Sequence, residues 1–504
     1  MMLRFSLHAF FLVSALGFVL PSQALAQLSI PGKVMTYRTL DLDSGEELER
    51  SRSWQVLDAH RARELTAITY AIGTEVVGEC TFANGFDRPA TTFRSIMRSK
   101  TGELERSDFD TFDPSYYPFL AKPIAANAQP GACVSKRSLD LGTLVRGGQI
   151  ETWIWSDGGS VGAIFRPEDN EKLAVPAGTF DSLRVRIDLD LSKVFPHVPE
   201  LFLKLVKPHF TIWITCREPY YVLKMAGFGT PNSKLHTNTV TELASIGELT
   251  ANDSKIPAEL AQADSAGEQP RLHAINSGSF RQGDRAGHVT FASASTPAGE
   301  ELAARVAFSN GLATESRTLI DRGASPATVY LDDRSLAANG ALVRKHVIFF
   351  RKAAFPNDPK KDLPADLYGA DMTLGAILPR LLPEGSDEAS FHVMDFSGEV
   401  NQLTIHRDGM MTVALGGDDK SSIHAKLKPI VDTPILMRPL AYFFIPSFDA
   451  YFDADSGHRL LKFEGPLGPP GVPNATMLAD ERLSGSADGA ALPGNQQDQD
   501  FSPR

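Results

Sequence analysis

The chain has 504 residues, a formal net charge of −11 and a pI near 5.6, and 42% of its residues are hydrophobic. A chain of this length exceeds what one hydrophobic core usually supports, so we expect two domains of ordinary size. The Lys and Arg residues form no dense cluster, which argues against nucleic-acid binding because phosphate recognition requires a positive surface.

The first 26 residues have the form of a secretory signal. Arg4 precedes an apolar stretch over residues 5–20, and a small-residue exit follows at residues 24–26. We expect cleavage before Gln27 and a mature chain in the periplasm or outside the cell. No later segment is predicted to span a membrane.

Three cysteines follow this signal: Cys80, Cys133 and Cys216. An oxidising compartment favours one disulfide and leaves one thiol over, but the sequence does not decide which pair forms.

A strand is predicted at residues 183–189 and another at 210–217, because apolar and polar residues alternate in both. In the second of these, Phe210, Ile212 and Ile214 share one face. A turn at residues 217–219 then leads into a further strand, so the sequence predicts an antiparallel hairpin.

Segment 175–231 recurs as segment 413–469 at a constant spacing of 238 residues. The matched positions are Gly178 with Gly416, Leu189 with Leu427, Pro196 with Pro434, Pro208 with Pro446, Phe210 with Phe448, and Leu223-Lys224 with Leu461-Lys462. Self-similarity at a long fixed spacing is typical of a duplicated unit. Helical periodicity is scarce, and residues 199–206 and 373–382 are the better candidates. The predicted fold class is therefore mostly β: two tandem copies of a twisted antiparallel sheet or half-barrel domain with few helices.

The chain divides into five predicted segments. They are a signal peptide (1–26), a first β domain (27–248), a linker (249–284), a second β domain (285–482) and a disordered tail (483–504). The linker and tail are rich in small and polar residues and poor in large apolar ones, so they offer little that would offset chain ordering.

Three features of the first half carry a resemblance to a known family. They are the string Val175-Pro176-Ala177-Gly178-Thr179-Phe180, the alternating strands after it, and Tyr221-Val222-Leu223-Lys224. They are similar to a domain family of unknown function in exported Gram-negative proteins, whose outline resembles the half-barrel of the lipoprotein-localisation carriers. The resemblance implies an exported scaffold and brings no established active site.

Ser160 lies in a Gly-x-Ser-x-Gly pattern, which in a hydrolase places a nucleophile between a strand and a helix. Strand-like residues stand on both sides here, and Asp157-Gly158 is a hairpin-turn dipeptide. We therefore interpret Ser160 as a turn residue and keep an envelope hydrolase as the alternative function.

Two patterns suggest a metal site and are better explained without one. Asp453 and Asp455 resemble the start of a calcium loop, but Gly457 stands where the next oxygen donor should be. His392, His406 and His424 lack the short spacing that places two ligands on one face. We interpret the first pattern as a hairpin turn and the second as surface histidines, and we expect no cofactor.

The apolar strand faces are the remaining candidates for binding. Their members are Phe210, Ile212, Ile214, Leu223, Met225, Phe448, Phe452, Leu461 and Phe463. They either line a cavity for a lipid or another apolar ligand or fill an ordinary core. Our hypothesis is an exported, non-enzymatic protein that binds an apolar molecule or a cell-envelope protein, with a structural scaffold of the envelope as a further alternative.

Overall fold

The structure is a computed structural model of the whole chain. It describes residues 30–57, 61–83, 86, 90–112, 128–130, 133, 139–156, 159–190, 209–227, 239–251, 253, 260, 272–321, 323, 327–350, 363–382, 386–394, 400–430, 448–455, 459–466 and 474–480. The expected signal peptide, the expected helix at 199–206 and the expected tail lie outside these residues.

The first half of the chain contains thirteen strands and one short helix among its described residues. In order they are β1 Lys33–Asp41, β2 Glu47–Leu57, β3 Arg61–Tyr70, β4 Glu75–Ala83, β5 Ala90–Arg98, β6 Leu104–Thr111, β7 Ala128–Pro130, α3 Leu141–Val145, β8 Ile150–Ser156, β9 Gly159–Val175, β10 Gly178–Asp190, β11 His209–Thr215, β12 Val222–Ala226 and β13 Thr239–Glu248.

The second half repeats this order of elements. It contains β14 His273–Gln282, β15 Arg285–Thr296, β16 Gly299–Phe308, β17 Ala313–Ile320, β18 Thr328–Leu336, β19 Leu342–Phe349, β20 Leu367–Gly369, α6 Leu374–Leu381, β21 Glu388–Met394, β22 Val400–Leu415, β23 Asp418–Ile430, β24 Phe448–Asp453, β25 Leu460–Pro466 and β26 Asn474–Ala479. The mostly β fold class is thus confirmed, and so is the helix expected at residues 373–382.

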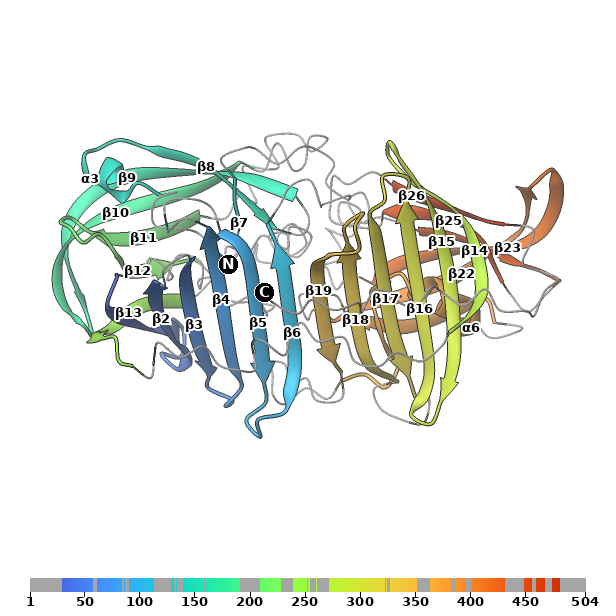
Figure 1. Cartoon of the computed structure of the whole chain (residues 1–504), viewed down its shortest axis with the longest axis horizontal. Coiled ribbons are helices and arrows are strands. Elements are labelled where there is room, and N and C mark those ends of the chain that lie inside the picture. The colour runs from blue at the N-terminus through green and yellow to red at the C-terminus, as the bar shows by residue number, and fades with distance from the viewer. Residues whose placement is uncertain are drawn as a thin grey trace, which may run out of the picture.

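All these strands belong to one 26-stranded sheet. In each half the sheet curls round, because the first strand of the half pairs with its last: β1 with β13 and β14 with β26. The two halves lie side by side along the long axis, joined where β6 pairs with β19 (Figure 1). Every described pairing is antiparallel except β7 with β8 and β20 with β21.

Matching turns recur 238 residues apart. Gly73 and Gly311 have φ of 88° and 86°, and Gly102 and Gly340 both have φ of 81°, a left-handed conformation that favours glycine. Strands β3 and β16 have bounds with this same spacing, as do β5 and β18, β6 and β19, and β8 and β21. The order of strands therefore repeats over the full length of the halves, although descent from a duplication stays a prediction.

The gapless register predicted for segment 175–231 is wrong in one hairpin. Ile187 of β10 pairs with Phe210, and Leu427 of β23 pairs with Phe448, which is the counterpart of Phe210. Leu427 therefore corresponds to Ile187, at a spacing of 240, and not to Leu189. A shift by two residues keeps every side chain on its face, which is why alternation alone could not reveal it.

Each half has its own main hydrophobic core on the inner side of its curled sheet. The first core includes Met35, Tyr37 and the buried face of α3, and the second includes Phe291, Phe391 and residues of α6. Burial of one face of each strand supplies the main stabilisation of such sheets.

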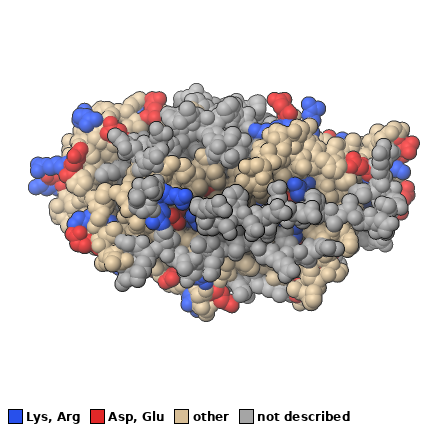
Figure 2. Space-filling view, in the orientation of Figure 1, with Lys and Arg blue, Asp and Glu red and all other residues tan. Residues whose placement is uncertain are grey.

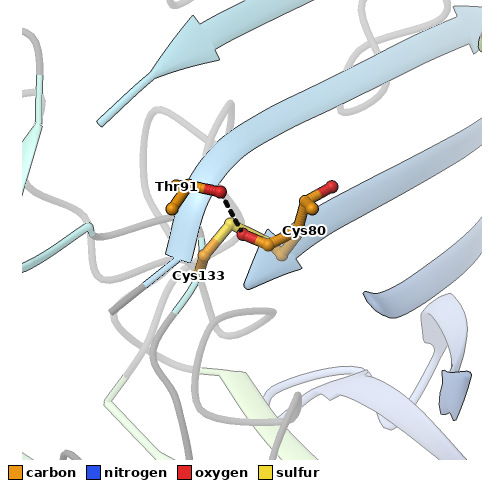
Figure 3. Close-up of a disulfide and its surroundings, with 4 residues drawn as sticks. Cys80, Thr91 and Cys133 are labelled. Atoms are coloured by element: carbon orange, nitrogen blue, oxygen red, sulfur yellow. Dashed lines mark hydrogen bonds between the residues drawn. A yellow bond between two sulfur atoms is a disulfide. The ribbon is translucent and has the colours of Figure 1, made fainter. Parts of the chain in front are cut away.

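Cys80 and Cys133 form the disulfide, and Cys216 is a free thiol. Cys80 lies on β4, where Thr91 of the next strand donates a hydrogen bond to the carbonyl of Thr81 at 3.1 Å (Figure 3). Both bonded cysteines are fully buried in a small cluster with Phe82. The bond joins residues 53 apart within the first half.

Two findings concern the predicted segments. Strand β14 lies inside the segment expected to be a linker and pairs with β15 and β26. Its alternating side chains include small and polar ones such as Asn276 and Ser277, so hydrophobic periodicity did not reveal it. Among the described residues, no helix is long and apolar enough to cross a bilayer.

Candidate functional site

The predicted apolar candidates lie in the cores of the two halves. Phe210, Ile212, Ile214, Leu223 and Met225 are buried members of the first core. Phe452 is buried in the second core, where Phe448 and Phe463 pack against it. Leu461 instead lies in a separate cluster with Val413 and Leu415. These side chains contact other side chains of the chain itself, so their role as ligand contacts stays a prediction.

Ser160 lies in β9, in a hairpin formed with β8. The residues after it continue as a strand to Val175, so the helix that follows a nucleophile in a hydrolase elbow is replaced by extended chain.

Three of the residues considered for metal binding, Asp453, His392 and His424, form hydrogen bonds within the chain. Asp453 accepts a bond from the backbone N–H of Asp455 at 3.0 Å, as in a turn. His424 was expected at the surface, but it is buried between Asp408 and Asp449 and stacks on Tyr451 at 4.7 Å. In the part of the chain that the structure describes, no group of three or more metal-ligating side chains is gathered.

A buried polar surface, not predicted from the sequence, lies on the inner face of β1, β2 and β3. Met35 and Tyr37 of the first core pair directly with Ser53 and Ser51, which places these serines on the inner face. We name this surface the polar inner face. Its members are Thr39, Glu49, Ser51, Ser53, Gln55, Glu64 and Thr66, all buried.

The second half has apolar or small side chains at most of the corresponding positions. Ser53 pairs with Thr66 in the first half, whereas Phe291 pairs with Ala304 in the second. In the same register, Val289 replaces Ser51 and Leu302 replaces Glu64. The fold therefore does not require polar side chains here, and burying a poorly bonded hydroxyl costs about 1–3 kcal/mol.

Glu49 is the most unusual member of the polar inner face. Its side chain is 2% exposed, and one carboxyl oxygen accepts a hydrogen bond from Thr39 at 2.9 Å. The other oxygen has no hydrogen-bond partner, and neither does the buried hydroxyl of Thr66. Burial raises the pKa of Glu49 to about 7, although the Thr39 hydrogen bond lowers it in part. Glu49 is thus poised between a neutral acid and a carboxylate near neutral pH.

Tyr37 lies at the border between the polar inner face and the first core. Its hydroxyl donates a hydrogen bond to the carbonyl of Val222 at 3.0 Å. Burial raises the pKa of Tyr37, and the nearby Glu64 and Tyr221 raise it further. Tyr37 therefore stays neutral, and it fixes β1 against β12.

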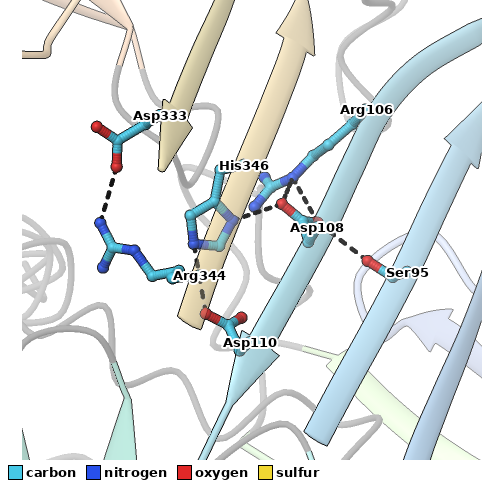
Figure 4. A network of polar contacts seen from close by, with 7 residues as sticks. All are labelled: Ser95, Arg106, Asp108, Asp110, Asp333, Arg344 and His346. Atoms are coloured by element: carbon cyan, nitrogen blue, oxygen red, sulfur yellow. Dashed lines mark hydrogen bonds and ion pairs between the residues drawn. The ribbon is translucent and has the colours of Figure 1, made fainter. Parts of the chain in front are cut away.

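A second polar cluster lies at the junction of β6 and β19 (Figure 4). His346 contacts Asp108 through Nδ1 at 2.8 Å and Asp110 through Nε2 at 3.6 Å. Asp108 also accepts hydrogen bonds from Ser95 at 2.9 Å and from Arg106 at 2.8 Å. The cluster is completed by Arg344, which bonds Asp333 at 3.0 Å.

Asp108 is ionised despite its burial. Burial alone would raise the pKa of this carboxyl, but Arg106 and the hydrogen bond with His346 together hold it well below its usual range. A carboxylate so buried must be paired, since an unpaired buried charge costs several kcal/mol.

The outer face of the sheet carries a shallow pocket of about 320 Å³ near Arg61, Arg94 and Phe109. Its arginines have partners within the chain, and Arg94 lies 4.0 Å from the buried Glu79. On the face that Figure 2 shows, acidic and basic side chains occur in small mixed groups rather than in one patch. Among the described residues on this side, the net negative charge therefore produces no concentrated acidic surface.

Comparisons with known proteins add little about the site. No family model matches the chain, and no curated protein matches it. A solved candidate lipoprotein from Parabacteroides distasonis is 13% identical, with a TM-score of 0.20, over 43% of this chain and 96% of that one. A candidate exported protein with a YmcC-like fold from Bacteroides fragilis is 11% identical, with a TM-score of 0.18, over 45% and 100%.

The complex of MucA and MucB from Pseudomonas aeruginosa also matches weakly. The identity is 8% and the TM-score 0.18, over 68% of this chain and 93% of that one. With TM-scores of 0.20 or less, these likenesses carry no argument about the fold or the function of this chain, and the predicted family resemblance stays a prediction.

Proposed function

We propose that the chain is an exported, non-enzymatic binding protein of the cell envelope, and that its first half holds the binding site on the polar inner face. The observation that supports this most is the contrast between the halves: Ser51, Ser53 and Thr66 occupy positions that hold Val289, Phe291 and Ala304 in the second half. Buried polar side chains that the fold does not need are expected where a ligand forms hydrogen bonds.

The chemistry of the face suggests the class of ligand. Two carboxyl groups and several hydroxyls can accept hydrogen bonds, and Glu49 has an acceptor oxygen without a partner. A ligand with an ammonium group or several hydroxyls would satisfy that oxygen and favour the charged form of Glu49. The sequence suggests a lipid or an envelope protein as the partner. Either could supply an ammonium group or hydroxyls, the lipid at its polar end.

Export is supported by the buried disulfide. Structural disulfides persist in the periplasm and outside the cell and are rare in the cytosol. The Cys80–Cys133 bond therefore agrees with the predicted secretory signal.

A thermal-shift screen tests the proposed site. We expect primary amines or polyols to raise the melting temperature of the wild-type protein and to lose this effect in Glu49→Gln. Glu46→Gln, which changes an exposed glutamate in the preceding turn, is the matched control and should respond like the wild type. Equal responses of all three proteins would contradict the proposed site.

A further inference from the structure

The pairing of β6 with β19 has an internal twofold symmetry. Asp108 lies opposite His346, and these two residues are themselves 238 positions apart. On one side of this pair Asp110 faces Arg344, and on the other Arg106 faces Ile348. Arg344 is the counterpart of Arg106 in the repeat and Ile348 is the counterpart of Asp110. The axis that exchanges the two strands therefore passes between Asp108 and His346.

Such a register is that of an isologous interface, in which the same strand of two copies pairs with itself about a twofold axis. Here the two copies are the halves of one chain. We propose that the acid–base pair of Asp108 and His346 makes each half select the other half as its partner and reject a second copy of itself.

Self-pairing of either strand would place two identical side chains at the axis. If β6 paired with β6 of another molecule in this register, Asp108 would face a second Asp108, and β19 would place His346 against a second His346. Two carboxylates directly opposite each other repel, whereas the observed acid–base pair forms a 2.8 Å hydrogen bond. Rejection of wrong partners commonly uses such a repulsive element.

The neighbouring charges do not provide this selection. In a β6–β6 pair, Asp110 would face Arg106, which is an attractive contact. The off-axis residues therefore tolerate self-pairing, and the axial position alone distinguishes the two arrangements.

Selection matters because each of these strands would be a sheet edge without the other. An unpaired edge strand presents free backbone groups to any other strand. At the two ends of the described sheet, by contrast, the outermost strands β7 and β20 are only three residues long. The junction strands β6 and β19, with eight residues each, would thus expose much longer edges than β7 and β20.

A complementation experiment on the full chain tests this proposal. His346→Asp gives a chain with carboxylates at both axial positions, and Asp108→His gives a chain with imidazoles at both. Alone, each variant should be a monomer whose melting temperature is several degrees below that of the wild type. Mixed or co-expressed, they should form a 1:1 dimer in which both junctions pair an Asp with a His. Native mass spectrometry would detect this dimer, and its melting temperature should approach the wild-type value.

A matched control exchanges another ion pair. Arg305 and Glu315 form a 2.8 Å pair between β16 and β17 of the same half, so Arg305→Glu mixed with Glu315→Arg should give no dimer. The proposal is overturned if the junction variants keep wild-type stability, if their mixture stays monomeric, or if the control mixture dimerises equally. If neither junction variant folds alone, recovery of the dimer only on co-expression supports the proposal, and failure on co-expression overturns it.

Discussion

At the scale of single residues, Glu49 shows why the polar inner face could not be predicted from the sequence. The run Glu47-Leu48-Glu49-Arg50-Ser51-Arg52-Ser53 is almost entirely polar, so it shows no apolar face to mark as buried. Burial of Glu49 and Ser51 depends on the side chains across from them on β1 and β3, which are distant from any local pattern.

Glu49 should make folding stability depend on pH. The unfolded chain ionises this carboxyl above about pH 4.3, whereas the folded chain keeps the proton until about pH 7. The free energy of unfolding therefore falls as the pH rises between these values, because only the unfolded chain releases the proton there. Above about pH 7 it stays at the lower value. Glu49→Gln removes this loss, which is on the order of 3 kcal/mol.

Urea unfolding at pH 5 and pH 8 measures this effect. The stability of Glu49→Gln minus that of the wild type should increase between the two pH values, while the difference for the exposed Glu46→Gln should stay constant. A constant difference for Glu49→Gln would show that Glu49 titrates normally in the folded chain.

At the scale of elements, α6 is anchored to the sheet by a partly buried carboxyl group. Asp371 accepts hydrogen bonds from the backbone N–H of Thr373 and from the hydroxyl of Thr318 on β17. Burial raises the pKa of Asp371 to about 7, and the nearby Asp333 adds to the effect, while the hydrogen bonds oppose it. The helix itself was predictable from its periodicity, but this anchor was not.

Replacing this carboxyl group tests the anchor. Asp371→Ala should lower the free energy of unfolding by about 1–3 kcal/mol, because two buried donors lose their acceptor. Asp371→Asn keeps an acceptor and should lose much less. Denaturant midpoints compare the two variants, and equal losses would show that hydrogen bonding does not hold the helix.

The disulfide should stabilise the first half. Closing a loop between residues 53 apart contributes about 4 kcal/mol in the chain-entropy description. Cys80→Ala/Cys133→Ala should therefore unfold at a clearly lower urea concentration than the wild type, whereas Cys216→Ser, which leaves the bond intact, should not. If the double variant and the control unfold alike, the bond contributes nothing to stability.

The predicted strands show what alternation can and cannot reveal. The strands at residues 183–189 and 210–217, and their counterparts in the second half, were correct because one face of each is apolar. The two-residue shift in the hairpin β22–β23 preserves that alternation and stayed hidden. Strand β14 was missed because its side chains are mostly small or polar.

At the scale of the whole molecule, the halves share an order of strands but differ inside. The 238-residue spacing predicted the repeat of elements, because turns and strand lengths depend on local sequence. It did not predict that the sheet continues through β6 and β19, since that pairing joins two segments distant in sequence. Nor did it predict that the inner face of β1, β2 and β3 is polar where its counterpart is mostly apolar, because the matched segments 175–231 and 413–469 do not include these strands.

The most direct test of the proposed function is native mass spectrometry of the protein purified from the periplasm. The wild type should retain a small polar or amine-bearing ligand, and Glu49→Gln/Ser51→Val/Thr66→Ala should have lost it while remaining folded. Arg50→Gln, on the outer face of β2, should retain it. Identical spectra for the wild type and the triple variant, or a ligand bound without the polar inner face, would contradict the proposed function.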